Sequence, residues 1–228
     1  GSSRFFNHLV FSCRAALAGL GLTPPGIVIG SSAHPMAALA ALCLAKKHRV
    51  PFIFEVRDIW PQTLVDIGAM HRYSPAALGM GILEKFLYRK ACVIISALPG
   101  GKEHVARLGI DRHKVIYIPN GTDLAWYDRC AEENVLTPEL TEFFQGMKER
   151  LVFIYAGAHG YANGLETLVE AAEILHRAGA HRIQILLVGD GPGKEGLVRA
   201  ARERALPNVT FLGPQDKNLV PVILKRSD

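Results

Sequence analysis

The chain has 228 residues, of which 49% are apolar and 21% charged. That balance excludes a disordered segment, a collagen-like repeat and a disulfide-stapled miniprotein, and the length suits one large domain or two small ones. The net charge of +5 is unevenly divided, since residues 1–120 hold 14 Lys and Arg against 6 Asp and Glu, whereas residues 121–228 hold 12 against 15. The basic first part indicates either an anionic partner, such as a membrane surface or a phosphate-bearing substrate, or an ordinary solvated face. It contains no long basic run, which argues against nucleic acid.

The cysteines and the chain ends bear on the setting of the protein. The four cysteines are Cys13, Cys43, Cys92 and Cys130. Because none stand at CxxC spacing and no histidine cluster accompanies them, we expect neither a zinc site nor a disulfide framework, and reduced thiols in the cytoplasm. The chain lacks an initiator Met and stops just after an apolar segment, so we interpret it as an internal fragment of a longer protein.

The first apolar stretch, residues 9–22, is interrupted by Arg14 and is too short to span a bilayer. The pattern around it fits either an interfacial helix on a membrane or an ordinary helix packed on a core. The apolar side chains concerned are Phe5, Phe6, Leu9, Val10 and Leu17, beside Arg4 and Arg14.

Apolar runs then alternate with helix-like segments. Strands are expected at residues 26–30, 51–56, 92–96, 114–118, 151–156, 182–188 and 208–212. Helices are expected at residues 35–48, 76–90, 165–178 and 194–205. Runs without polar alternation are typical of strands buried on both faces of a parallel sheet. The strand–helix–strand repetition predicts an α/β fold with right-handed crossovers.

The alternation of expected strands and helices is interrupted once. Residues 119–121 (PNG) form a turn signal, and the polar, acidic residues 131–150 show no strand pattern. We therefore predict two Rossmann-like parallel-sheet units, both incomplete, over residues 1–120 and 151–228, joined by a helical linker over residues 121–150.

Charged residues follow the second expected strand directly, in the segment 55–61 (EVRDIWP). In open α/β sheets ligands bind outside the carboxyl ends of the strands, and charges placed there are costly unless they are paired or functional. Arg57 and Asp58 are therefore candidate site residues, or simply partners of each other. His34 follows the first strand and lies at the same edge, where a neighbouring serine fits the start of the next helix.

Two glycine-rich loops follow strands of the second part. In residues 155–164 (YAGAHGYANG), Gly157 and Gly160 would let backbone amides approach a diphosphate, with His159 as a further donor; a long capped turn is the alternative. Residues 191–196 (GPGKEG) match G-x-G-x-x-G, with Asp216 about 20 residues downstream, as in a nicotinamide-cofactor site. A plain helix-start turn or a sugar-nucleotide site fits the same loop.

Some classes of site are missing from the sequence. It holds no Asp-x-Asp pair, no HExxH and no G-x-S-x-G elbow, and Lys194 is followed by Glu195, which excludes a Walker A loop. A metal-dependent transferase, a zinc hydrolase and the usual α/β-hydrolase therefore have no visible residue set.

Five segments, taken together and in order, resemble one family. They are residues 51–61 (PFIFEVRDIWP), 118–123 (IPNGTD), 155–168 (YAGAHGYANGLETL), 187–192 (LVGDGP) and 208–214 (NVTFLGP). The chain resembles the family 4 glycosyltransferases, which have the two-domain GT-B fold. It is especially similar to the branch that builds bacterial surface polysaccharides, including the L-fucosamine transferases. The resemblance covers nearly all of the chain from residue 24 onward.

The resemblance implies transfer of a sugar, with retention, from a nucleotide-sugar to a saccharide or lipid-linked acceptor, without a metal or another cofactor. It places the protein in the cytoplasm, at the inner face of an anionic membrane. It implies a diphosphate site at Gly157, His159 and Gly160 and a nucleoside site at Gly189, Gly213 and Gln215, with Gly191 and Asn163 also on the donor side. Arg57 and Asp58 are then the expected catalytic residues, and His34, Glu55 and Trp60 the expected acceptor-side residues.

The chain departs from the family pattern in places. Many relatives carry an Arg and a Lys in the loop where this chain has His159 and Asn163, and a His at the place of Arg57. The later family motif of two Glu separated by seven residues has no counterpart, so we expect the fragment to bind a nucleotide-sugar weakly and to be inactive. The alternatives are an NAD-dependent oxidoreductase, a sugar-nucleotide epimerase of the same architecture and a non-catalytic membrane-docking module.

Overall fold

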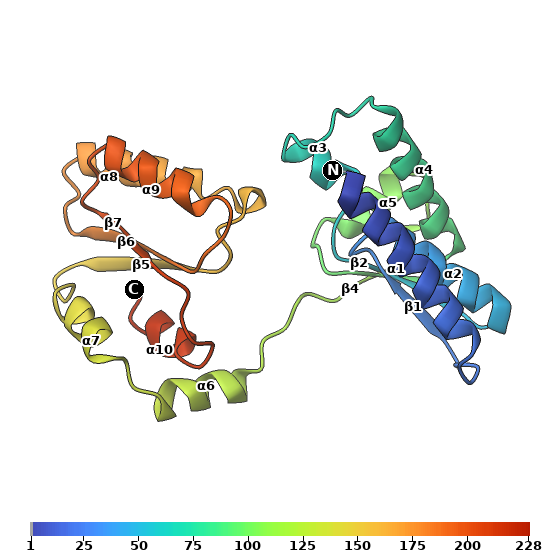
Figure 1. Cartoon of the computed structure of the whole chain (residues 1–228), viewed down its shortest axis with the longest axis horizontal. Helices are drawn as coiled ribbons and strands as arrows, with labels where there is room; N and C mark the ends of the chain where they lie inside the picture. Colours follow the sequence, from blue (N-terminus) through green and yellow to red (C-terminus); the bar gives the residue numbers. More distant parts are fainter. Residues whose placement is uncertain (1) are drawn as a thin grey trace. The chain divides into compact units, whose positions relative to one another are not determined.

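The computed structural model describes residues 2–228, which form two compact units, one ending at Gly121 and the other running from Thr122 to Asp228. Figure 1 shows the order of their helices and strands. Both units are α/β and both sheets are entirely parallel, so the predicted fold class is confirmed.

The first unit has a four-stranded sheet in the order β1-β2-β3-β4. Its strands are β1 (Val28–Ser31), β2 (Phe52–Val56), β3 (Val93–Ser96) and β4 (Val115–Tyr117). Its helices are α1 (Ser2–Leu20), α2 (Pro35–His48), α3 (Gln62–Asp66), α4 (Pro75–Lys90), α5 (Gly101–Arg107) and the 3₁₀ turn η1 (Arg112–Lys114). All four strands lie where apolar runs predict them, and β1 continues one residue further.

One face of this sheet carries the core. The buried side chains include Leu42 of α2, Phe54 of β2, Leu87 of α4 and Val105 of α5. The opposite face is less covered, because Ile29 and Ile116 are 56% and 49% exposed. The expectation of strands buried on both faces is therefore wrong for this sheet. The physical reason is that α2, α4 and α5 all contribute to the same core, on one face.

The second unit has a three-stranded sheet in the order β5-β6-β7. Its strands are β5 (Leu151–Ala156), β6 (Ile183–Val188) and β7 (Val209–Leu212). Its helices are α6 (Leu124–Glu133), α7 (Pro138–Gln145), α8 (Glu166–Arg177), α9 (Lys194–Glu203) and α10 (Val220–Leu224), with the 3₁₀ turn η2 (Tyr161–Asn163).

Two cores cover the two faces of this second sheet, with α8 and α9 on one face and α7 and α10 on the other (Figure 1). Side chains of β6 alternate between them, since Leu186 joins the α7 side and Leu187 the α8 side. Residues 121–150, expected as a helical linker, contain α6 and α7, and Leu140 and Phe144 of α7 pack against the sheet. The α7 segment therefore belongs to the second core.

None of the helices described over residues 2–228 combines the length and the apolar character that crossing a bilayer requires.

Candidate functional site

Ser32, directly after β1, holds together the strand ends of the first sheet. Its side chain is buried, and its Oγ accepts hydrogen bonds from the backbone N–H groups of Arg57 (2.8 Å) and Asp58 (3.2 Å). The same hydroxyl donates to the backbone carbonyl of Asp58 at 3.1 Å. A buried hydroxyl with three partners fixes the turn that follows β2. Sequence reasoning considered this position only as a helix start.

Four of the predicted residues of the first unit lie around that turn. Trp60, half-buried, donates from Nε1 to the backbone carbonyl of Ser32 at 2.7 Å. Glu55 is half-buried at the end of β2, and its backbone carbonyl accepts from the N–H of Ser32 at 2.8 Å. Arg57 and Asp58 are exposed, and they form no ion pair with each other. Their charges are therefore available to a ligand at this edge.

His34 lies at the same edge but has a structural task. It is buried at the start of α2, where Nδ1 accepts from the N–H of Ala37 at 3.2 Å and caps the helix. Its ring stacks on that of His8 of α1, with centroids 4.2 Å apart. Burial, and then the proximity of His8, lower the pKa of His34, so the ring is held neutral.

A buried polar network lies under this edge. Glu84 of α4 accepts at Oε1 from the Tyr88 hydroxyl at 2.9 Å and lies 3.0 Å from Nε2 of His104. Burial, and then Glu84, strongly raise the pKa of the Tyr88 phenol. Glu84 and Tyr88 line the same small cavity as Asp58 and Trp60. Sequence reasoning missed this network; its signal is a carboxylate four residues before a tyrosine within an apolar helix.

In the second unit the loops after β5 and β6 interlock. The His159 N–H donates to the backbone carbonyl of Asp190, and the Gly193 N–H donates to the backbone carbonyl of His159, each at 2.8 Å. Gly189 has φ +132°, and a Cβ there would lie 2.0 Å from the carbonyl oxygen of Gly157. The glycines therefore serve the contact between the two loops, a role that the sequence motifs do not reveal.

His159 lies inside the fold rather than on the loop surface. Its side chain is fully buried near the rings of Tyr155 and Phe211, at centroid distances of 6.2 and 6.4 Å. Neither ring nitrogen has a hydrogen-bond partner. Burial, and then the nearby Lys194, lower the pKa of His159, so the ring is neutral near pH 7. The predicted contact between this imidazole and a diphosphate therefore has no open path here.

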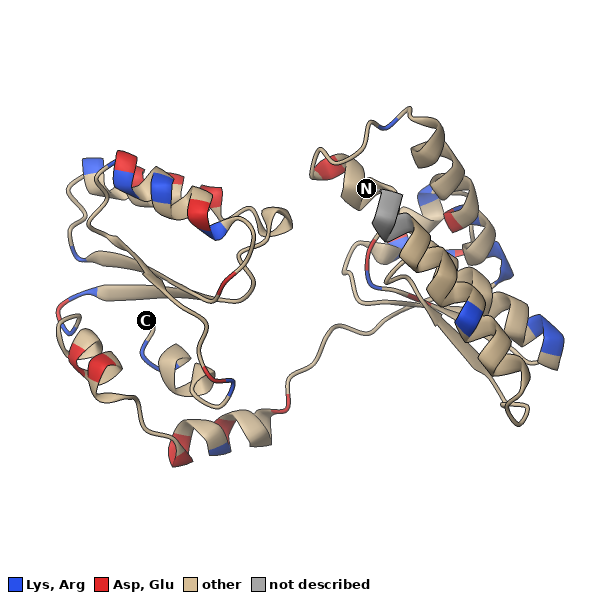
Figure 2. Cartoon of the chain, in the orientation of Figure 1, with Lys and Arg blue, Asp and Glu red and all other residues tan. Residues whose placement is uncertain are grey.

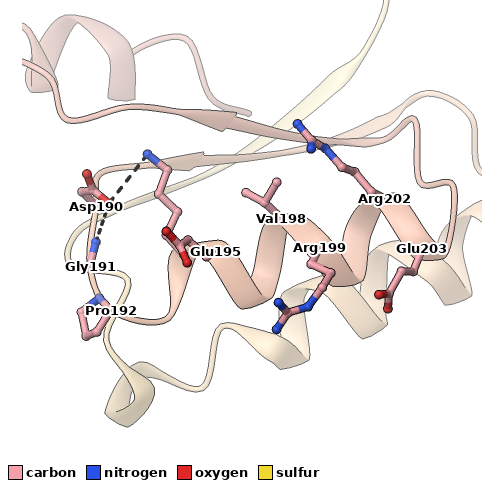
Figure 3. A pocket seen from close by; sticks show the side chains of 9 residues that line it. Asp190, Gly191, Pro192, Glu195, Val198, Arg199, Arg202 and Glu203 are labelled. Atoms are coloured by element: carbon pink, nitrogen blue, oxygen red, sulfur yellow. Dashed lines mark hydrogen bonds and ion pairs between the residues drawn. The ribbon is translucent and has the colours of Figure 1, made fainter.

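Charged groups surround the start of α9. Asp190 Oδ1 accepts from the Gly191 N–H at 2.8 Å and lies 3.8 Å from Nζ of Lys194. An open hollow of about 860 Å³ runs from this loop along α9, where Arg199 and Arg202 also line it (Figure 3). Neither arginine stood among the sequence candidates, although their spacing of three residues places them on one helix face.

The remaining predicted donor residues complete the same strand edge. Asn163 donates from Nδ2 to the backbone carbonyl of Ala158 and so fixes the loop after β5. Gly160 lies in that loop without close crowding of its Cβ position, and Gly213 is open after β7. Gln215 Nε2 donates to the carbonyl of Gly213 at 3.3 Å. The loops after β5, β6 and β7 thus bring the predicted donor residues to one edge of the second sheet.

Across residues 2–228, no group of three or more His, Cys, Asp or Glu side chains is placed to hold a metal ion.

Two parallel α/β units, the second with glycine-bearing loops at three neighbouring strand ends, agree with the GT-B class of protein that the sequence motifs predict. Residues 3–121 match the family described as "Glycosyl transferase 4-like domain". Residues 139–228 match the family described as "Glycosyl transferases group 1". The chain belongs to the glycosyltransferase 4-like family, as its sequence motifs predict. The oxidoreductase, epimerase and non-catalytic module alternatives are not favoured.

Two curated proteins of Escherichia coli are similar over part of the chain. The glycosyl transferase WcaI of strain K12, whose name assigns it to colanic acid biosynthesis, is 29% identical over 120 residues, which are 53% of this chain and 28% of WcaI. The O-antigen chain mannosyltransferase C is 38% identical over 61 residues, which are 27% of this chain and 15% of that protein. The chain thus matches well under half the length of either relative.

Solved structures share the fold at low identity. Anabaena HepE (Alr3699) in complex with UDP has a TM-score of 0.65 at 16% identity, over 95% of this chain and 54% of HepE. An α,α-trehalose-phosphate synthase (UDP-forming) from Burkholderia vietnamiensis has a TM-score of 0.73 at 14% identity, over 100% of this chain and 56% of that protein. These likenesses support the GT-B fold.

Proposed function

We propose that the chain is part of a glycosyltransferase that moves a sugar, with retention, from a nucleotide-sugar to a saccharide or lipid-linked acceptor in surface polysaccharide biosynthesis. Family membership and the names of the two Escherichia coli relatives support the reaction and its setting. The crystal structure of HepE with UDP supports a nucleotide donor. The proposed location is the cytoplasmic face of the membrane, where a lipid-linked acceptor would lie.

The observation that carries the proposal is the interlocked pair of glycine loops at the carboxyl edge of the second sheet. Gly189 and Gly191 allow the two loops to touch, and α9 begins directly after them with Lys194 in its first turn. Helix N-termini and free amides favour anions, and this edge is where open α/β sheets bind ligands. We assign the donor diphosphate to this edge, with Lys194 and backbone amides offsetting the charge of the leaving group without a metal or cofactor.

The acceptor is assigned to the carboxyl edge of the first sheet. Ser32 and Trp60 hold the turn that presents Arg57 and Asp58, and both charged side chains are exposed. We assign to Asp58 the acceptance of the proton of an acceptor hydroxyl, and to Arg57 the binding of an anionic group of either substrate. His34 and Glu55 support the same edge through the helix cap and the strand end.

Ligand-induced stabilisation tests this proposal without requiring turnover. A ligand that binds the folded state raises stability by RT ln(1 + [L]/Kd), so a thermal titration with UDP, GDP and NAD separates the classes of site. We expect a rise in Tm with UDP or GDP. A rise with NAD alone would contradict the proposal and favour the oxidoreductase alternative.

A matched pair of variants locates the site. Lys194→Gln should weaken nucleotide diphosphate binding about tenfold, because a hydrogen bond to a charged group contributes about 1.5 kcal/mol or more. Arg177→Gln, at the end of α8 and paired with Glu173, removes the same charge elsewhere in the unit and should leave affinity unchanged. Equal affinities of both variants would exclude Lys194 from the site.

A further inference from the structure

The outer edge of β7 has unpaired backbone groups. β7 is the last strand in the order β5-β6-β7, so only β6 lies beside it. The Ile185 N–H of β6 donates to the carbonyl oxygen of Asn208 at 2.8 Å, and alternate residues of β7 continue this ladder. The N–H and C=O groups of Val209 and Phe211 therefore point away from β6, and they have no backbone partner among residues 2–228. β7 presents these groups in one row along its outer side.

The two edges of the second sheet differ. Edge strands are often protected from pairing by a charged side chain, a proline or a bulge, and β7, with the sequence VTFL, contains no charge and no proline. The opposite edge, along β5, is partly occupied. There the Val152 N–H donates to the Asp228 carboxylate at 2.9 Å, and the Asp228 N–H donates to the carbonyl oxygen of Val152 at 3.1 Å. The β7 edge is therefore the better candidate for pairing with another chain.

A groove lies between this edge and α9. It has a volume of about 600 Å³ and adjoins the hollow beside α9, since Lys194, Val198 and Arg202 line both. Most of its lining is apolar and comes from Val198, Ala201, Ala205, Leu206, Pro207, Val209 and Phe211. An apolar groove beside an unpaired strand suits a partner that supplies both a strand and apolar side chains.

The open side of α9 carries charges of both signs (Figure 2). Glu195 and Arg202 are exposed, and neither forms an ion pair with any residue of the range 2–228. Val198 lies between them, and spacings of three and four residues place all three on one face of the helix, beside the hollow (Figure 3). The opposite charges are nearly equidistant from Val198. Such a face is complementary to an antiparallel copy of itself.

We propose that β7 and α9 form the interface of a homodimer, in which a second copy of this chain is related to the first by a two-fold axis near Thr210. Val209 of each copy would pair with Phe211 of the other in an antiparallel ladder, and each pair would exchange both of its N–H···O=C bonds. The two three-stranded sheets would then form one continuous sheet. This interface goes beyond glycosyl transfer and does not depend on it.

The same axis brings the two α9 helices together. Each α9 packs on both β6 and β7, since Leu197 and Ala201 share a core with Ile185 and Val209. Neighbouring strands lie about 4.8 Å apart, so helices that cover these two strands in each copy would lie about 10 Å apart across the joined sheet. Packed helices are separated by about 8–10 Å, so the α9 helices would be in contact.

The direction of α9 sets the charge pairing. α9 begins beside the end of β7 and ends beside its start, because it connects two parallel strands. A two-fold axis near the middle of both elements therefore places Glu195 of each copy beside Arg202 of the other, with the two Val198 side chains at the axis. A polyanion or an acidic peptide fits less well, because it would attract Arg202 and repel Glu195.

Sedimentation velocity of the whole chain, from about 1 to 200 µM, tests the proposal. We expect the molar mass to rise with concentration from that of one chain towards that of two, because association follows mass action. A two-fold interface is closed, so assembly should stop at two copies. A single chain at every concentration, or growth beyond two copies, would overturn the proposal.

Charge reversal identifies the surface. Arg202→Glu should weaken dimerisation about tenfold or more, because an attraction becomes a repulsion at two symmetric positions. Glu195→Arg combined with Arg202→Glu exchanges the two charges and should restore the dissociation constant to within about threefold of the parent value. The matched control, Lys148→Glu, makes the same change of net charge at an exposed position before β5 and should dimerise like the parent. Equal dissociation constants for Arg202→Glu and Lys148→Glu, or no recovery in the double variant, would overturn the proposal.

A proline in β7 tests the strand pairing. Val209→Pro removes an N–H that points away from β6, at the first residue of an edge strand, so the ladder between β6 and β7 keeps its hydrogen bonds. We expect dimerisation to weaken at least about tenfold, since each copy loses one donor to the other. Circular dichroism and thermal unfolding establish that the variant is folded. A folded variant that dimerises as tightly as the parent would exclude β7 from the interface, and if the variant does not fold, the charge exchange decides.

Discussion

Gly189→Ala tests the interlocked loops directly. The substitution places a Cβ 2.0 Å from the carbonyl oxygen of Gly157, at a residue with φ +132°. A side chain in that backbone region costs about 1–3 kcal/mol. Moving the loops apart to relieve the contact would also weaken the hydrogen bonds between His159 and the loop after β6, each worth about 0.5–1.5 kcal/mol. With both hydrogen bonds counted, we expect a total loss of about 2–6 kcal/mol.

Gly213→Ala is the matched control. Gly213 lies after the neighbouring strand β7, and a Cβ there meets no heavy atom within 4 Å. We expect this variant to stay within about 0.5 kcal/mol of the parent chain. The comparison therefore isolates the contact between the loops from the general effect of replacing a strand-end glycine.

Urea unfolding followed by tryptophan fluorescence measures both variants. The chain has two tryptophans, Trp60 in the first unit and Trp126 in the second, so a Trp60→Phe background reports on the second unit alone. With a urea m-value of about 1–3 kcal/mol/M, a loss of about 2–6 kcal/mol lowers the urea midpoint by about 1 M or more. If Gly189→Ala and Gly213→Ala unfold at the same urea concentration, the two loops do not depend on their close approach at Gly189.

Two further predictions concern buried polar groups. The pKa of His159 is lowered from 6.5 by burial, so the unfolded chain binds more protons below about pH 6.5, and the second unit should lose stability as pH falls through that value towards the lowered pKa. His159→Leu should flatten this part of a urea-midpoint profile, and an unchanged slope would contradict the account. Glu84→Ala should destabilise the first unit by about 1–3 kcal/mol, because the Tyr88 hydroxyl loses its acceptor and His104 its partner. Thermal unfolding measures this variant beside Glu103→Ala, a control at the exposed start of α5 that should lose less stability. Equal losses of stability in the two variants would rule out a special role for the network.

Apolar periodicity was sufficient to locate the strands. Runs such as residues 182–188 hold four or more aliphatic side chains without polar alternation, and β6 is buried along nearly its whole length. Turn signals then separate the helices, because proline and a capping residue stand at the starts of α2 and α4. The apolar runs and capping residues therefore predict the type and order of these strands and helices, and that order is sufficient to assign the fold class.

The arrangement of the site required tertiary information. Ser32 contacts residues 57 and 58 across more than 20 positions of sequence, and nothing local distinguishes it from Ser31. His159 resembles a ligand-binding residue in sequence, yet its ring is fully buried. The sequence also does not predict the exposed face of the first sheet, because an isoleucine such as Ile29 is equally common on a covered face.

The length of α2 separates the two edges of the first unit. This helix has 14 residues and is therefore about 21 Å long, and it runs from the edge that carries Arg57 and Asp58 to the opposite edge, where Lys46 and Lys47 are exposed. Because exposed charges are screened within about 8–10 Å in physiological salt, these lysines contribute almost nothing to the attraction of an anionic group at Arg57. The positive charge that such a group meets must therefore come from the carboxyl edge itself.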